Sequence, residues 1–164
     1  MIFRTAALYD LPTIVAIYNA TIPSRMVTAD TSPVSVESKR EWFEKHTPDH
    51  RPIWIIEEEK KIAGWISLTN FHERPAYGAT CEVSIYLDAA FQSRGIGRGA
   101  LQYAIDNCPK LGIKTLVGLI FDNNAPSLKL FKYFGFEEWG FLPGVAELDG
   151  NDRSVVILGK RITN

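Results

Sequence analysis

Cysteine is scarce in this chain of 164 residues, and its charges nearly cancel. The two cysteines, Cys81 and Cys108, have neither the number nor the spacing of a disulfide framework or a C-x-x-C site, and they fit a reducing compartment. Because 18 Lys and Arg residues stand against 19 Asp and Glu residues, the formal net charge is -1. No overall positive field is available to attract nucleic acid or an anionic membrane. An anionic ligand would therefore have to be bound by a local site.

Long apolar runs and the common metal-binding patterns are also missing. The most apolar segments, such as Leu116–Phe121, are far shorter than the roughly 20 residues that a transmembrane helix requires. The first five residues lack the charged and apolar regions of a secretory signal. The sequence contains no H-E-x-x-H motif, and Pro48 separates His46 from His50, which argues against one helical metal-binding face. We expect a cytoplasmic protein with no membrane partner, no nucleic-acid partner and no metal.

What the chain does contain is the composition of a folded domain. Hydrophobic residues make up 46% and charged residues 23% of the sequence, which is typical of globular proteins and excludes a disordered tail or a coiled coil. A chain of this length buries roughly 70% of its unfolded surface on folding, so it needs no metal or disulfide. No repeat, low-complexity stretch or linker interrupts the sequence. We therefore expect residues 1–164 to form a single domain of the α/β or α+β class.

Strand and helix signals alternate along the chain. Strands are expected where apolar and β-branched residues cluster, at residues 2–7, 52–57, 62–69, 80–87, 114–121, 137–141 and 154–161. Helices are expected to begin near residue 10, to cover residues 36–46 and 125–134, and to run from the Gly-rich turn at residues 95–99 to about residue 107. The charged turn between the second and third strands predicts an antiparallel hairpin. The stretch from Thr21 to Pro33 predicts a loop with one helical turn.

Three glycines, Gly95, Gly97 and Gly99, lie between a predicted strand and a predicted helix. Residues without a side chain let the backbone approach a ligand closely, and N–H groups at the start of a helix bind anionic oxygen. Arg94 and Arg98 flank the turn and could neutralise part of a pyrophosphate charge. Glycines at such a turn can also serve only to permit a tight bend. Three of them within five residues favour a phosphate-bearing ligand.

The same glycines raise dinucleotide binding as an alternative. Residues 95–100 fit the pattern G-x-G-x-x-A, and Asp122 follows the next predicted strand, where a ribose-binding acid belongs. In the dinucleotide fold, however, the strand runs straight into the first glycine, whereas residues 88–94 intervene here. The motif also follows a predicted antiparallel hairpin. These two differences argue against a nicotinamide-binding fold.

Two segments carry a resemblance to a known family. Residues 92–97 resemble the Q/R-x-x-G-x-G/A pyrophosphate loop of the GNAT superfamily of N-acetyltransferases, and residues 124–136 resemble the segment that follows it in that superfamily. Within the superfamily, the chain is similar to the phosphinothricin and methionine sulfoximine acetyltransferases at residues 17–19 and 74–77, at Thr80 and at Glu82. The resemblance implies an α/β (α+β) single domain with a mixed, mostly antiparallel sheet of six to seven strands and about four flanking helices. The sheet would be splayed between its fourth and fifth strands, with acetyl-CoA in the opening.

The resemblance also implies where acetyl-CoA binds. Backbone groups of the fourth strand would bind the pantetheine and polarise the thioester, and they belong to Ile85, Tyr86 and Leu87. Backbone N–H groups of the Gly-rich loop would hold the pyrophosphate, and they come from Ser93, Arg94, Gly95, Ile96, Gly97 and Arg98. The Asn124 side chain would contact the pantetheine arm.

Glu82 is the candidate general base. Strand alternation places Glu82, Ser84 and Tyr86 on the face of the 80–87 strand opposite Cys81 and Val83, so Glu82 is the lone carboxylate in the interior of this strand. The strand pattern alone favours a solvated face. By resemblance, Glu82 matches the glutamate that removes a proton from the substrate amine, through water. Cys81 shares an apolar face, so a small core residue is favoured over an acyl-enzyme nucleophile.

The acid and the acceptor site are less well defined by the sequence. Many superfamily members place a tyrosine acid where this chain has Phe131, and Tyr133 lies about 200° around the helix from it. The thiolate would then leave without a side-chain acid, or water would protonate it. A bidentate arginine is the natural partner of an amino-acid carboxylate, and by resemblance Arg74 binds substrate, with Phe71 and Tyr77 nearby. An ordinary surface arginine is the alternative.

The expected function is transfer of the acetyl group of acetyl-CoA to the α-amine of a small amino-acid-like acceptor by direct attack. The resemblance also implies a homodimer. Two alternatives stay open at this point. A nicotinamide-dependent oxidoreductase would bind NAD in place of acetyl-CoA, and a non-catalytic sensor would bind acyl-CoA without releasing a free thiol. The sensor is conceivable because of Phe131.

Overall fold

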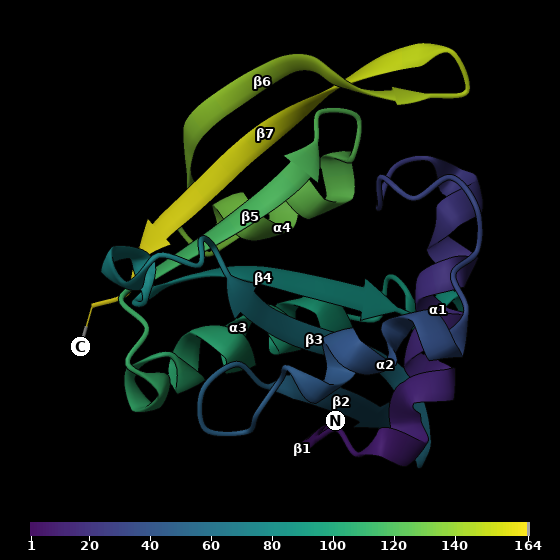
Figure 1. Cartoon of the computed structure of the whole chain (residues 1–164), viewed down its shortest axis with the longest axis vertical. Helices are drawn as coiled ribbons and strands as arrows, with labels where there is room; N and C mark the ends of the chain where they lie inside the picture. Colours follow the sequence, from purple (N-terminus) through teal and green to yellow (C-terminus); the bar gives the residue numbers. More distant parts are fainter. Residues whose placement is uncertain (164) are drawn as a thin grey trace.

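One twisted sheet organises residues 1–163, which are the residues that the computed structural model describes (Figure 1). Its strand order is β1-β2-β3-β4-β5-β7-β6. The strands are β1 (Ile2–Thr5), β2 (Ile53–Glu58), β3 (Lys61–Asn70), β4 (Thr80–Leu87), β5 (Thr115–Phe121), β6 (Glu137–Leu148) and β7 (Asn151–Arg161). The expected mixed, mostly antiparallel sheet is confirmed, because β4 and β5 form its one parallel pair within the described residues.

Four α-helices cover the two faces of the sheet within the same residues. They are α1 (Leu11–Thr21), α2 (Val36–Glu44), α3 (Ile96–Asn107) and α4 (Ala125–Tyr133). Short 3-10 helices occur at Leu8–Asp10, Ile22–Ser24, Pro75–Tyr77, Ala89–Phe91 and Pro109–Leu111. The larger apolar core lies under α3 and α4, and a smaller one lies under α1 and α2. The helices and the central strands therefore lie close to where the sequence predicts them.

The sheet opens between β4 and β5. Parallel pairing joins Thr80, Cys81 and Glu82 to residues 115–117 and then stops, although β4 continues to Leu87. Figure 1 shows the two strands diverging from their paired ends, with α1 facing the opening. The predicted splay is thus confirmed. A doubly wound dinucleotide fold requires a parallel sheet, so the nicotinamide alternative is wrong.

Two local predictions differ from the structure. The sequence predicts a strand that ends at Phe141, but β6 continues through Pro143 and Gly144 to Leu148 and forms one long hairpin with β7. A register shift between Leu142 and Ala146 accommodates the proline and the glycine. The sheet edge therefore extends well beyond α4, as the arch of β6 and β7 in Figure 1 shows.

Asp10 also has a role other than the helix cap that its position suggests. Its side chain makes no cap hydrogen bond to α1. It is instead buried, accepts hydrogen bonds from the Arg4 guanidinium at 2.8 and 2.9 Å, and accepts another from the Ala7 N–H. Burial alone would raise the pKa of the Asp10 carboxyl, but these donors hold it below its ordinary value. This ion pair anchors β1 to the start of α1.

Candidate functional site

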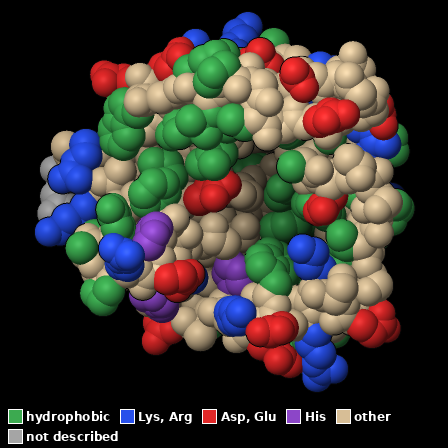
Figure 2. Space-filling model, turned by 45° about the horizontal axis from the view of Figure 1, so that its top comes forward, with side chains coloured by type: hydrophobic (Ala, Val, Ile, Leu, Met, Phe, Trp, Pro, Cys, Tyr) green, Lys and Arg blue, Asp and Glu red, His purple; other side chains and the backbone are tan. Residues whose placement is uncertain are grey.

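A groove of about 500 Å³ fills the wedge between β4 and β5. Its walls come from the end of β4, from the middle of β5, from α4, and from the end of α1 with the residues that follow it to Val27. Figure 2 shows this face of the molecule hollowed near its centre. Because β4 has no β5 partner beyond Glu82, alternate residues of Val83–Leu87 direct backbone N–H and C=O groups toward the groove. The groove is therefore partly lined by unpaired backbone.

The Gly-rich loop closes one end of the groove. Gly95 occupies the left-handed region with φ 78° and caps α3, while Ser93 has φ 60°. The first hydrogen bond of α3 runs from the Gly99 N–H to the Gly95 carbonyl, so the N–H groups of residues 96–98 have no acceptor within the helix. Ser93 and Gly97 line the groove. This arrangement suits the negatively charged oxygens of a phosphate.

The groove brings together some of the residues predicted to bind acetyl-CoA and leaves others outside its lining. Those that line it are Ile85, Tyr86, Leu87, Ser93, Gly97 and Asn124. Those that do not are Arg94, Gly95, Ile96 and Arg98. The Arg94 guanidinium forms an ion pair with Glu59 at 2.6 Å, and that of Arg98 lies over the Tyr133 ring at 4.4 Å. Both arginines thus already have partners that local sequence could not reveal.

The third glycine of the loop has a packing role. A Cβ at Gly99 would lie 2.6 Å from the Cε of Met1, a separation that real Cβ contacts essentially never show. The N-terminal residue therefore packs over the first turn of α3.

Asn124 and Phe131 form the α4 wall of the groove. Asn124 is buried and caps α4, where its Oδ1 accepts a hydrogen bond from the Ser127 N–H at 3.3 Å. Phe131 is buried, lies edge-on to Phe136 and covers the backbone of Gly118. Tyr133 is 64% exposed and packs against Arg98. Tyr133 therefore does not take the place of a tyrosine acid at position 131.

Glu82 lies where the parallel pairing ends. It is half-buried and lies opposite Thr69 of β3. On its face of β4 the next residue is Ser84, which lines the groove, although Glu82 itself is not part of the lining. Burial raises the pKa of the Glu82 carboxyl above its ordinary value. A carboxylate with a raised pKa beside a cleft is a candidate for proton transfer.

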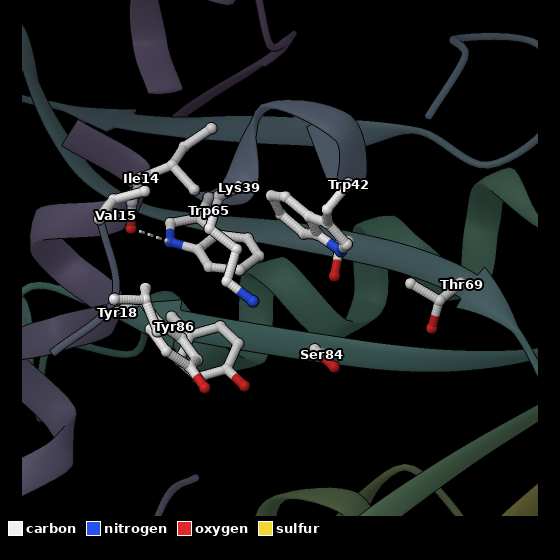
Figure 3. Close-up of a pocket in the computed structure, with 11 residues that line it drawn as sticks. Ile14, Val15, Tyr18, Lys39, Trp42, Trp65, Thr69, Ser84 and Tyr86 are labelled. Atoms are coloured by element: carbon white, nitrogen blue, oxygen red, sulfur yellow. Dashed lines mark hydrogen bonds between the residues drawn. The ribbon is translucent and has the colours of Figure 1, made fainter. Parts of the chain in front are cut away.

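A second, smaller cavity of about 190 Å³ lies beneath α1 and α2 (Figure 3). Ser84 and Tyr86 line both this recess and the groove. Sequence reasoning missed the recess, although Lys39 and Trp42 are spaced i, i+3 on α2 and both line it. That spacing was a usable signal, since it places a cation on the face of the helix that carries its aromatic anchors.

The predicted acceptor residues Phe71, Arg74 and Tyr77 lie on an exposed loop and line neither cavity. The loop is nevertheless anchored. Arg51 is 4% exposed, and its guanidinium donates to the Asn70 side chain at 2.6 Å and to the Gly78 carbonyl at 2.7 Å. The same side chain thus holds both ends of the segment that carries Arg74. Binding of the acceptor by these three residues stays a prediction.

Other chemistries find little support in the structure. Burial raises the pKa of the Cys81 thiol to about 11 and that of the Cys108 thiol to about 12, so both are poor nucleophiles at neutral pH. Among residues 1–163, no group of three or more His, Cys, Asp or Glu side chains is arranged to hold a metal ion. The helices described in this structure include none with the length and apolar character needed to cross a membrane.

Comparison with known proteins agrees with this geometry. YwnH of Bacillus subtilis, whose name gives phosphinothricin acetylation as a provisional activity, is 50% identical over 164 residues, 99% of this chain and 100% of its own. The L-methionine sulfoximine/L-methionine sulfone acetyltransferase of Pseudomonas aeruginosa is 28% identical over 148 residues, 90% of this chain and 86% of its own.

Solved structures share the whole fold. One that is provisionally named a phosphinothricin N-acetyltransferase has a TM-score of 0.95 at 49% identity, covering 99% of each chain. A phosphinothricin acetyltransferase from Sinorhizobium meliloti, solved in complex with AcCoA, has a TM-score of 0.91 at 24% identity, covering 98% of this chain and 88% of its own. The Acetyltransferase (GNAT) family matches residues 14–136. The chain therefore belongs to the GNAT family of acetyltransferases.

Proposed function

We propose that this acetyltransferase moves the acetyl group of acetyl-CoA to the α-amine of a small amino-acid acceptor, with Glu82 as the general base. The observation that carries the proposal is the position of Glu82. It ends the parallel pairing of β4 and β5, one same-face step from a residue that lines the groove. The groove proposed for the acyl donor and the proposed base therefore lie next to each other on β4.

Acetyl-CoA has suitable partners along the groove. Its pyrophosphate matches the N–H groups of residues 96–98, which lack intrahelical acceptors. Its pantetheine arm carries amide groups, which match the unpaired backbone of Ile85–Leu87 and the side chain of Asn124. A β4 N–H group directed at the thioester oxygen would stabilise the oxyanion that forms during attack. Arg94 would strengthen pyrophosphate binding only by leaving Glu59.

Glu82 would prepare the amine for attack. An α-ammonium group must lose a proton before its nitrogen can attack the thioester carbonyl. The raised pKa of Glu82 makes its carboxylate a stronger base than an exposed glutamate, while burial limits competition from bulk water. Since Glu82 lines neither cavity, we infer that the proton reaches it through one water molecule.

The leaving thiolate would take its proton from water. The nitrogen–carbon bond forms as the amine attacks, and the carbon–sulfur bond then breaks to release the CoA thiolate. Phe131 lines the groove but carries no proton donor at the position where many superfamily members have a tyrosine. One of the two protons on the attacking nitrogen is lost to solvent as the amide forms, and the other stays on the amide. One acetyl amide and one free thiol are produced.

Arg74 remains our candidate for binding the acceptor carboxylate, with Phe71 and Tyr77 beside it. Phe71 and Tyr77 lie edge-on with ring centroids 5.9 Å apart, so they form a small apolar wall next to the guanidinium. The homodimer and the cytoplasmic location also stay predictions. Sedimentation equilibrium of the purified chain tests the homodimer.

A thiol-release assay tests the proposal. Acetyl-CoA is mixed with phosphinothricin, methionine sulfoximine, methionine sulfone and the common amino acids, and free CoA is measured with a thiol reagent. We expect release that depends on both the enzyme and an α-amino acid, with the N-acetyl product visible by mass spectrometry. Acetyl-CoA binding in a thermal-shift assay without thiol release from any amine would favour the non-catalytic sensor instead.

A further inference from the structure

The recess beneath α1 and α2 is built mainly from aromatic rings. Trp65 and Tyr86 are stacked with ring centroids 4.6 Å apart, Trp42 lies edge-on to Trp65, and Tyr18 lies edge-on to Tyr86. Figure 3 shows these rings surrounding one space. A hydrogen bond of 3.1 Å from the Trp65 indole to the Ile14 carbonyl fixes the central ring. The walls are therefore rigid and preformed.

One cation enters this aromatic space. The Lys39 ammonium lies 5.8 Å from the centroid of the Tyr18 ring, and Figure 3 shows the Lys39 side chain directed between the rings. None of the residues that line the recess is an aspartate or a glutamate. The lining thus carries a single formal charge, and that charge is positive.

Lys39 differs from the basic residues next to it on α2. Arg40 forms an ion pair with Glu44 at 2.9 Å, and Lys45 forms one with Glu41 at 3.2 Å, both on the exposed side of the helix. Lys39 is half-buried, and within residues 1–163 no carboxylate oxygen lies within 4.0 Å of its nitrogen. The Asp30 carboxylate is instead bound by the Tyr18 hydroxyl. A half-buried ammonium without a counter-ion attracts an anion.

The floor of the recess leads to the proposed base. It runs along β3 and β4 from the Trp65–Tyr86 pair to Thr69 and Ser84, and Thr69 lies opposite Glu82. Successive residues on one strand face are about 7 Å apart. An amino acid whose amine lies between Glu82 and the thioester can therefore direct its side chain along this floor, below Lys39.

We propose that the recess holds the side chain of the acceptor and that Lys39 selects side chains that end in an anion. This proposal rests on the proposed function and deepens it. The preferred acceptors are α-amino acids of glutamate length with a terminal phosphinate or carboxylate. Arg74 would then bind the α-carboxylate of the acceptor. The aromatic walls accommodate the apolar methylene groups between the two anions.

Phosphinothricin and methionine sulfone provide the matched pair that tests this selection. Both carry a methyl group and two oxygens on a tetrahedral atom at the end of the same two-carbon chain, but the phosphinate is charged and the sulfone is neutral. We expect the wild type to have the higher kcat/KM with phosphinothricin. In Lys39→Met this value should fall by about 10- to 100-fold, as expected for a lost charged hydrogen bond, while the value for methionine sulfone changes little.

The controls separate the possible failures. Arg40→Gln alters a cation on the outer side of the same helix and should leave the ratio of the two kcat/KM values unchanged. Equal losses for both acceptors in Lys39→Met would assign Lys39 to the shared α-carboxylate and overturn the proposal. No loss for either acceptor would overturn it as well. Thiol release from neither acceptor, with wild type or variant, would instead contradict the proposed function.

A binding measurement tests the recess without turnover. Trp42 and Trp65 line it, so a bound acceptor should alter the intrinsic tryptophan fluorescence. Phosphinothricin titrated into the wild type should bind more tightly than methionine sulfone, and Lys39→Met and Lys39→Gln should remove that preference. If Lys39→Met fails to fold, Lys39→Gln, which retains a polar end group, answers the same question. Equal affinity of both acceptors for the wild type overturns the proposal.

Discussion

The ring of Phe131 lies so close to the backbone of Gly118 that a Cβ at Gly118 would stand 2.6 Å from the Phe131 Cε1. Both residues line the groove. The ring therefore occupies space that any other residue at position 118 would need.

Gly118→Ala should push the Phe131 ring into the groove. We expect the KM for acetyl-CoA to rise several-fold and the free energy of unfolding to fall by about 1–3 kcal/mol, the usual cost of overpacking. Steady-state kinetics with varied acetyl-CoA and thermal unfolding measure the two effects. Gly118→Ala combined with Phe131→Leu is the matched control and should recover most of the loss. An equal loss in both backgrounds would mean that the ring is not responsible.

Glu82→Gln tests the base. The same substitution should lower the activity of the enzyme but raise its stability. Turnover should fall by about 10²- to 10⁴-fold, as for loss of a general base, with acetyl-CoA affinity nearly unchanged. The wild-type kcat should rise with pH as Glu82 ionises, and this acidic limb should be absent from the residual activity of the variant. Unaltered turnover would remove Glu82 from the mechanism.

The stability effect follows from the raised pKa of Glu82. Because the folded protein holds this proton more tightly than the unfolded chain, ionised Glu82 lowers stability as pH rises from the ordinary glutamate range through its folded pKa. Glutamine carries no such charge. We therefore expect Glu82→Gln to have the higher Tm at about pH 8 and a Tm closer to that of the wild type at about pH 4. The reverse order would contradict the burial of this carboxyl.

Arg51→Met should loosen the loop that carries Arg74. The substitution removes the donor to the Asn70 side chain and to the Gly78 carbonyl. Because both residues are exposed and water can replace part of what is lost, the cost should be about 0.5–1.5 kcal/mol for each hydrogen bond. We expect a lower Tm and a higher KM for the amino acid, with the KM for acetyl-CoA unchanged. Arg4→Met, a similar change in a half-buried arginine far along the sheet, is the control for general destabilisation. An unchanged acceptor KM would separate this loop from substrate binding.

The sequence predicted the elements whose signals are local. The bounds of β4 and the end of α3 match the prediction, because strand alternation and helical periodicity act over a few neighbouring residues. The glycines and their position before a helix indicated an anion site at the Gly-rich loop, whereas the β4 residues of the groove came from the family resemblance. Glu82 needed the family resemblance, since its strand pattern alone favoured a solvated face.

Contacts between distant segments account for what the sequence did not predict. The Arg94 side chain is held by Glu59 of the β2–β3 turn, and Gly99 is packed under Met1. Neither partner is visible from the motif itself. The continuation of β6 past Pro143 was missed because proline and glycine are turn signals, and only pairing with β7 overrides them. The position of Lys39 in the recess depends on the packing of α2 against β3, where Trp42 contacts Trp65.

The wedge between β4 and β5 leaves a strip of sheet edge inside the molecule without a strand to pair with it. Acetyl-CoA bound as proposed would lay its amides along that strip and act as a temporary neighbouring strand, so a metabolite would complete part of the sheet. The resistance of the protein to heat and proteolysis should then depend on the concentration of that metabolite, because ligand that binds only the folded form stabilises it by mass action. The lifetime of the enzyme in the cell would be coupled to the supply of its own acyl donor.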